Sequence, residues 1–297
     1  MRLSLSPIQR GYILVVVAAF SFAAKSILVK LCFQYGVDPV TALALRMFFA
    51  SLVFGSVLAW NLYKGNWNLR FTASQWLWII MLGFWGYYIS ALLDFMGLVY
   101  IDASLGRMIL FLYPTMVVVI NAIITRTAIQ RTTWLALALC YGGIFLMMAP
   151  GFGELQPHFW LGGLLTFLSA LLYAAYLVGV GRLLENMNPV RFTSVLMCLC
   201  CLVVAVHFLA TRDIGELAVP PQVVFYGALM GLFSTALPIY AVTCGIALIG
   251  ASKAAMVSMV GPVLTFIMGM IVLDETLTLV QLAGMALIML GVIRVGK

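Results

Sequence analysis

The sequence predicts an all-α, polytopic membrane protein whose ten transmembrane helices form two inverted five-helix repeats. Three observations predict this fold class: the apolar composition, the distribution of basic residues among the loops, and a repeat at a spacing of 148 residues. Of the 297 residues, 65% are hydrophobic and only 8% are charged, whereas an ordinary soluble domain has about 25% charged residues. A spanning helix needs roughly 20 apolar residues, so the chain has room for about ten.

Apolar runs define the ten predicted spans. Charged residues or prolines separate each run from the next. Proline ends a helix because it lacks the backbone N–H that a helix interior needs. The runs place the spans near residues 11–33, 40–62, 74–97, 103–125, 132–149, 158–181, 190–210, 221–246, 251–273 and 277–295. The loops between them are too short to house a soluble domain.

The basic residues are distributed unevenly among the loops. Among the odd-numbered loops, only the seventh carries one, Arg212. The N-terminus, the even-numbered loops and the C-terminus together carry Arg2, Arg10, Lys64, Arg70, Arg126, Arg131, Arg182, Arg191, Lys253, Arg294 and Lys297. Because Lys and Arg stay on the cytoplasmic side, we expect an even number of spans in the cell inner (plasma) membrane, with both termini cytoplasmic. The net charge of +7 then reflects orientation, and we expect no nucleic-acid partner.

The two halves of the sequence are weakly similar to each other. A shift of 148 residues aligns Gly97 with Gly245, Pro114 with Pro262, and Gly143 with Gly291, and Pro39 meets Pro189 after a two-residue slip. We interpret residues 1–150 as a first repeat of spans 1–5 and residues 151–297 as a second repeat of spans 6–10. Because five is an odd number, the second repeat must cross the membrane in the opposite sense, as in many secondary transporters.

Short motifs recur towards the end of each half. The second half has Ala251-Ser252, Pro262, an Asp274-Glu275 turn, Gly284 and Gly291, and the first keeps Ala103-Ser104, Pro114 and Gly143. With these motifs the chain resembles the drug/metabolite transporter superfamily, specifically its EamA-type ten-span members. It departs from the pattern at Thr127, where an acidic residue would align, and at Ser21-Phe22, where many members of the family have Trp-Gly. The resemblance implies an inner-membrane permease, often an exporter of amino acids, related metabolites or small organic compounds, with no bound cofactor.

Charged side chains within the predicted spans are the first candidates for a substrate pathway. A charge at the centre of a membrane helix costs about 2.5–3.5 kcal/mol on insertion scales. All five such residues lie in the first half, on the outer side of the membrane: Lys25, Lys30, Arg46, Asp94 and Arg107. Lys30 and Arg107 could instead extend to the headgroups, and Asp94 could form a structural ion pair with Lys25, Arg46 or Arg107. In the functional interpretation the cluster attracts a carboxylate or other anion, and Asp94 binds a substrate ammonium or a proton.

Polar stripes on the third and fourth spans support the functional interpretation. Helical spacing places Gly83, Tyr87, Ser90 and Asp94 on one face, and Arg107, Phe111, Pro114, Val118 and Asn121 on another. Pro114 and Pro262 are expected to kink their helices, and Pro114 would free the carbonyl of Leu110 for a cavity. Helix packing explains such stripes about equally well.

Deep aromatic residues are candidate walls of a central cavity. Tyrosine in mid-bilayer needs a hydrogen-bond partner, which a polar cavity provides. The candidates are Trp85, Tyr88, Tyr113, Tyr173, Tyr176 and Tyr240. Core packing is the alternative for each of them.

The sequence has none of the motifs that would indicate an enzyme. It has no HExxH and no Walker A loop, and its two histidines pair with no Cys or Ser. We expect no metal and no cofactor. The predicted function is a secondary transporter or facilitator that exports a small organic metabolite by alternating access, as a monomer in the lipid bilayer and with protons as a candidate coupling ion. The alternatives are a membrane scaffold and an intramembrane enzyme without transport activity.

Overall fold

The computed structural model describes residues 6–101, 106, 109–148, 158–264 and 279–295, and every regular element among them is helical. In the first half the elements are α1 (Pro7–Ala23), α2 (Lys25–Gln34), α3 (Pro39–Tyr63), α4 (Ala73–Met81), η1 (Leu82–Ile89), α5 (Ser90–Tyr100), α7 (Tyr113–Thr125) and α8 (Arg131–Met148). In the second half they are α9 (Phe159–Leu183), η3 (Leu184–Asn186), α10 (Pro189–Thr211), η4 (Ile214–Leu217), α11 (Pro221–Gly231), η5 (Leu232–Ala236), α12 (Leu237–Ile249), α13 (Ala251–Val257), η6 (Ser258–Val260) and α15 (Leu279–Val295). The prediction of an all-helical fold is therefore confirmed for the described residues.

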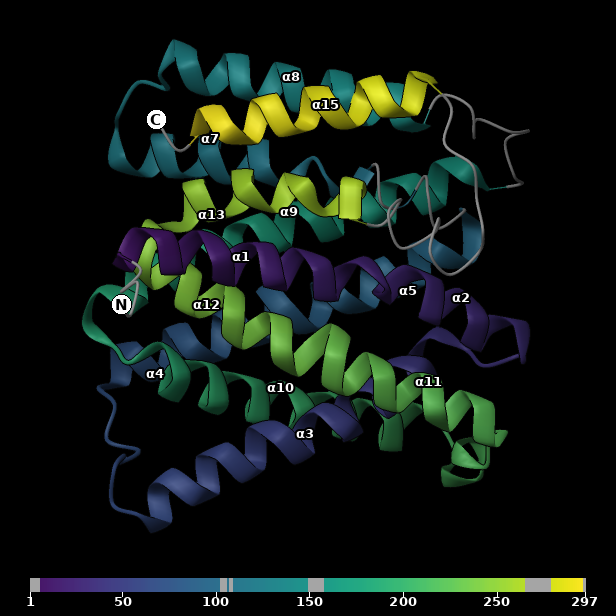
Figure 1. Cartoon of the computed structure of the whole chain (residues 1–297). Helices are drawn as coiled ribbons and strands as arrows, with labels where there is room; N and C mark the ends of the chain where they lie inside the picture. The colour runs from purple at the N-terminus through teal and green to yellow at the C-terminus, as the bar shows by residue number, and fades with distance from the viewer. Residues whose placement is uncertain (1–5, 102–105, 107–108, 149–157, 265–278, 296–297) are drawn as a thin grey trace, which may run out of the picture.

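Six helical stretches are long and apolar enough to cross a membrane. They are Pro7–Gln34, Pro39–Tyr63, Ala73–Tyr100, Phe159–Asn186, Pro189–Thr211 and Pro221–Ile249. Four shorter apolar helices occupy the other predicted positions: Tyr113–Thr125, Arg131–Leu146, Ala251–Leu264 and Leu282–Arg294. The count of ten full spans stays a prediction. In Figure 1, α1 begins and α15 ends at the same end of the bundle, as an even number of crossings requires.

Local sequence signals set the helix starts. Ser6 and Gln9 form a capping box at the start of α1, and Thr72 and Gln75 form another at α4. In such a box each partner satisfies a backbone N–H that the first turn leaves unpaired. Proline also occupies the first turn of α1, α3, α10 and α11, where its missing N–H costs nothing.

Packing between the halves follows the 148-residue shift. The most extensive helix pairs are α8 with α15, α1 with α12, α5 with α9, and α3 with α10, and each joins one helix of the first half to one of the second. The shift maps α5 onto α12 and α9 onto α1, so these two pairs are equivalent. It maps each of the other two pairs onto itself. The contacts between the halves therefore recur at the spacing found in the sequence.

Two glycines repeat this pattern at the level of single contacts. A methyl group on Gly143 would lie 2.5 Å from the carbonyl oxygen of Gly284 and would press on Ile288. A methyl group on Gly291, 148 residues later, would lie 2.5 Å from the sulfur of Cys140 and 2.8 Å from the carbonyl oxygen of Ala136. Glycine at both positions lets α8 and α15 approach closely, as small residues do in membrane helix interfaces.

Irregular backbone occurs at equivalent places in the two halves. The third long helical stretch contains the π-helix η1, and the stretch from Pro221 to Ile249 contains the π-helix η5. The shift places η5 within the counterpart of η1. A turn at residues 111–112 similarly matches the 3₁₀ segment η6. Non-helical backbone at membrane depth is tolerated where it lines a cavity, so these four segments mark where a cavity could lie.

The structure corrects the expected role of Pro114. The prediction was a kink inside a continuous helix, but Pro114 lies in the first turn of α7, directly after the turn at 111–112. Proline cannot donate a backbone hydrogen bond, so it begins a helix more readily than it bends one. The carbonyl of Phe111 accepts a hydrogen bond from the Tyr141 hydroxyl at 3.2 Å. Pro262 likewise follows the irregular segment η6.

An ion pair at the end of the bundle joins loops from the two halves. Arg212, at the end of α10, donates to the carboxylate of Asp38 at 3.1 Å. Asp38 also caps α3 by accepting from the backbone N–H groups of Val40 and Thr41. Burial on its own would raise the pKa of Asp38, but the hydrogen bonds from Thr41, Arg212 and Val40 outweigh it and hold the pKa below its ordinary value. The carboxylate is thus stabilised in its charged form.

Candidate functional site

A cavity of about 110 Å³ lies between the two halves. Taking about 10–15 Å³ for each water-sized probe, it has room for a small organic solute. Its wall includes residues at three of the four irregular segments: Tyr87 of η1, Ser258 of η6 and Phe111 at the turn before α7. The lining is Ala19, Phe22, Ala23, Lys25, Arg46, Tyr87, Ser90, Ala91, Asp94, Leu110, Phe111, Tyr113, Ser169, Tyr173, Ser258 and Gly261.

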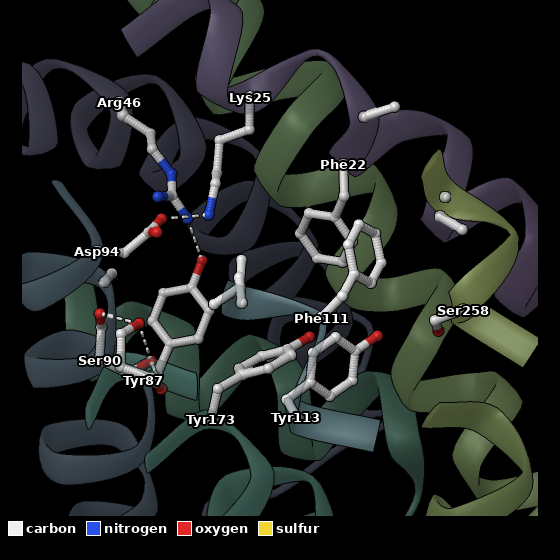
Figure 2. A pocket seen from close by; sticks show the side chains of 16 residues that line it. Phe22, Lys25, Arg46, Tyr87, Ser90, Asp94, Phe111, Tyr113, Tyr173 and Ser258 are labelled. Atoms are coloured by element: carbon white, nitrogen blue, oxygen red, sulfur yellow. Dashed lines mark hydrogen bonds and ion pairs between the residues drawn. The ribbon is translucent and has the colours of Figure 1, made fainter. Parts of the chain in front are cut away.

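The charged lining residues gather at one end of the cavity. Figure 2 shows the side chains of Lys25, Arg46 and Asp94 converging there from α2, α3 and α5. The Lys25 ammonium donates to the Asp94 carboxylate at 2.6 Å, and the Asp94 side chain is almost fully buried. Of the ion pairs proposed for Asp94 from the sequence, the structure forms the one with Lys25.

Arg46 is held by one neutral residue from each half. Its Nη2 donates to the Tyr87 hydroxyl at 2.6 Å and its Nε donates to the Thr235 hydroxyl at 2.7 Å. Tyr87 belongs to η1 and Thr235 to η5, and the two positions are 148 residues apart. The guanidinium also lies 5.5 Å from the centre of the Phe95 ring, within the range of a cation–π contact. Arg46 is only 3% exposed.

The opposite end of the cavity is aromatic. Figure 2 shows Phe22, Phe111, Tyr113 and Tyr173 grouped away from the charges. The rings of Tyr113 and Tyr173 meet edge to face with centroids 5.2 Å apart. Ser90 and Ser169 lie at another part of the wall, where each hydroxyl donates to the other residue's backbone carbonyl. The cavity therefore pairs a cationic end with an apolar one.

Most of the predicted site residues meet in this cavity. Lys25, Arg46, Tyr87, Ser90, Asp94 and Tyr113 all line it. Three of the four residues on the face predicted for the third span, Tyr87, Ser90 and Asp94, line the cavity although η1 interrupts the α-helix. The fourth, Gly83, instead faces Cys200.

Four other predicted residues lie elsewhere in the structure. Trp85 is 52% exposed on the outside of the bundle. Tyr176 packs behind the wall against Tyr87, with ring centroids 5.9 Å apart. Tyr240 shares a hydrogen bond with Ser194 at 2.7 Å, and Asn121 lines a separate polar pocket with Arg182 and Lys253. Trp85 lies two positions before Tyr87, so its side chain leaves the third span on a different side from Tyr87, Ser90 and Asp94. The predicted site residue Arg107 lies outside the described residues.

Sequence reasoning did not single out Thr235, Ser258 or Ser169 as site residues. A hydroxyl in an apolar helix is common and usually bonds its own backbone, as Ser258 does to Ala254 at 2.9 Å. Thr235 could have been found only by applying the 148-residue shift to Tyr87.

A two-ended cavity enclosed by repeated helix pairs is the arrangement expected of a membrane transporter. The chain belongs to the EamA-like transporter family, whose pattern matches residues 9–149 and again residues 160–296. Each half is thus matched separately.

Several curated proteins of the same kind are similar to this chain. A Bacillus subtilis (strain 168) protein named "Uncharacterized transporter YcbK" is 29% identical over 279 residues, which cover 92% of this chain and 88% of that one. An "Uncharacterized transporter" of Archaeoglobus fulgidus is 26% identical over 217 residues, covering 72% and 75% of the two chains. A solved structure titled "Crystal structure of protein" has a TM-score of 0.76 with 15% identity and covers 96% of both chains, which supports the fold alone.

Proposed function

We propose that this protein is a secondary transporter that exports a small organic metabolite, an amino acid or related compound, by alternating access. The observation that carries this proposal is the cavity, because helices of both halves enclose it and it holds a buried charged cluster at one end. Buried charge inside a membrane is expensive and is usually retained for a substrate or ion pathway.

The recurrence of contacts between the halves supports the mechanism. Alternating access needs two related states, and a pair of inverted five-helix repeats supplies them when the halves exchange roles. The equivalent helix pairs, the paired glycines and the two separate family matches are the features expected of such repeats. The excess of basic residues in alternate loops supports an orientation with both termini in the cytoplasm.

Transport can be tested with the purified protein in proteoliposomes loaded with a panel of labelled amino acids and related organic acids. We expect efflux of at least one solute above the rate from protein-free vesicles. Ser258→Phe should abolish this efflux, since the ring would fill much of a cavity of about 110 Å³. Ser56→Phe is the matched control, because Ser56 is exposed on α3. Absence of efflux for every solute, or equal efflux from Ser258→Phe and the wild type, would contradict the proposal.

Within this mechanism, Asp94 is the candidate proton-binding group. It is buried in the cavity and its carboxylate contacts Lys25, so proton uptake would release the ammonium. Efflux measured with and without an imposed pH gradient should respond to the gradient in the wild type and not in Asp94→Asn. If transport by both proteins does not respond to the pH gradient, the protein is an uncoupled facilitator and Asp94 is not a coupling site.

A further inference from the structure

The described lining of the cavity contains one cation more than it has acidic partners for. Among the described lining residues the charged ones are Lys25, Arg46 and Asp94. Lys25 and Asp94 form an ion pair at 2.6 Å, so the single acid is already occupied. In the described part of the chain, no acidic oxygen lies within 4.0 Å of Arg46, which leaves its charge uncompensated.

The guanidinium also has an unused donor. Nε and Nη2 donate to Thr235 and Tyr87, but Nη1 is fully buried and has no hydrogen-bond partner among the described residues. A buried donor without an acceptor costs about 1–3 kcal/mol, and more when the group is charged. Such a group in a native site calls for a bound acceptor. A carboxylate that enters the cavity beside Arg46 would supply both the missing acceptor and the missing negative charge.

We propose that the cavity selects an aromatic monocarboxylate that lacks an ammonium group, with Arg46 as the residue that binds its carboxylate. The tyrosine and phenylalanine rings at the other end match the ring of such a solute, and the size of the cavity limits it to a small one. This inference rests on the proposed transport function, whose solute it names by chemical class.

The ion pair gives the reason for preferring an acid to an amino acid. The ammonium of an amino acid needs an anionic partner, and Asp94 could serve only by giving up its contact with Lys25. The displaced Lys25 and the bound ammonium would then be two cations close to Arg46. An acid without the ammonium avoids this cost, because it brings the described cavity to neutrality and leaves the pair intact.

Binding to the detergent-solubilised protein tests this inference separately from transport. Three probes of similar shape are suitable for titration calorimetry: 3-phenylpropanoate, L-phenylalanine and the neutral 3-phenylpropanamide. We expect the acid to bind more tightly than either of the others by roughly tenfold to a hundredfold, the range for a hydrogen bond between charged groups. Equal or tighter binding of phenylalanine, or of the amide, would overturn the proposal.

Two substitutions locate the carboxylate. Arg46→Gln should remove the preference for the acid over the amide, whereas Arg46→Lys should keep part of it because the charge remains. Arg191→Gln is the matched control, since Arg191 lies outside the cavity and donates to Asn68 and to the carbonyl of Arg70. A preference that survives in Arg46→Gln would show that another residue binds the carboxylate.

Asp94→Asn separates the two solute classes most sharply. If the carboxylate binds Arg46, this change removes the negative charge beside it and tightens binding of the acid. If the site instead takes an amino acid, Asp94 binds its ammonium and the change abolishes binding, which would overturn the proposal. Binding of the acid without efflux from proteoliposomes would leave this inference standing and would refute the transport function, so the two failures are distinguishable.

Discussion

The two halves of this protein have the same helical frame but different chemistry at equivalent positions. Tyr87 and Thr235 are related by the 148-residue shift and both accept a hydrogen bond from the same guanidinium. Lys25 corresponds to Tyr173, and both line the cavity. Arg46 corresponds to Leu196 when the two-residue slip at Pro39 and Pro189 is applied. Packing contacts are repeated, whereas every charged residue of the described lining comes from the first half.

The packing residues and the charged residues are therefore subject to different constraints. The helix contacts must fit in both halves, because each half packs against the other through equivalent surfaces. The charges need to occur only once, because the cavity is shared. Substitutions in the charged set should therefore have no counterpart in the second half, whereas substitutions in the frame should act equally in either half.

The largest expected effect follows from breaking the buried ion pair. Lys25→Gln leaves the Asp94 carboxylate, 4% exposed, without its partner at 2.6 Å. Removing one member of a buried pair costs about 3–5 kcal/mol, because the remaining charge stays desolvated. The double variant Lys25→Gln, Asp94→Asn should recover most of this loss. Thermal unfolding in mild detergent measures both, and a double variant that melts as low as the single one would argue against an essential charge pair.

A smaller effect should appear equally in both halves. Gly143→Ala and Gly291→Ala each place a methyl group 2.5 Å from an atom of the facing helix. Overpacking of this kind costs about 1–3 kcal/mol, and we expect the two losses in unfolding free energy to agree within error. Gly142→Ala is the control, because a methyl group there meets no atom within 4 Å. Unequal losses would show that the α8 and α15 surfaces are not equivalent.

The smallest effect concerns the ion pair outside the cavity. Asp38→Asn keeps a residue that caps α3 well but removes the charge that Arg212 contacts. Because the pKa of Asp38 is lowered in the fold, its contribution is present above the ordinary carboxyl pKa of about 3.9 and is lost as the pH falls through the folded value. The wild type should therefore melt slightly higher at pH 7, and the difference should vanish at strongly acid pH and shrink in high salt. If the difference in melting temperature persists at low pH, it arises from helix capping rather than from the charge.

The helices could be predicted from the sequence because each physical signal was local. Apolar runs and prolines located helix ends such as Pro39, Pro189 and Pro221 within a few residues. The polar face with Tyr87, Ser90 and Asp94 was also predicted, since helical spacing alone brings these residues to one side.

The rest of the site required contacts that no local pattern encodes. The choice of Lys25 over Arg46 as the partner of Asp94 depends on how α2 and α3 approach α5. Trp85 was assigned to the cavity from its depth in the span, although it lies two positions before Tyr87 and therefore faces another side of the helix. Ser258 and Thr235 were missed because a hydroxyl in an apolar helix has no signature until its neighbours are known.

The position of Arg46 restricts which residues the two halves can carry at equivalent positions. Equivalent hydroxyl groups of Tyr87 and Thr235 flank a single guanidinium, so an arginine at Leu196 would reach toward the same pair from the other half. Two guanidinium groups there would repel each other in a medium that screens charge poorly. The packing contacts can therefore recur in both halves, whereas the arginine has room in only one of them.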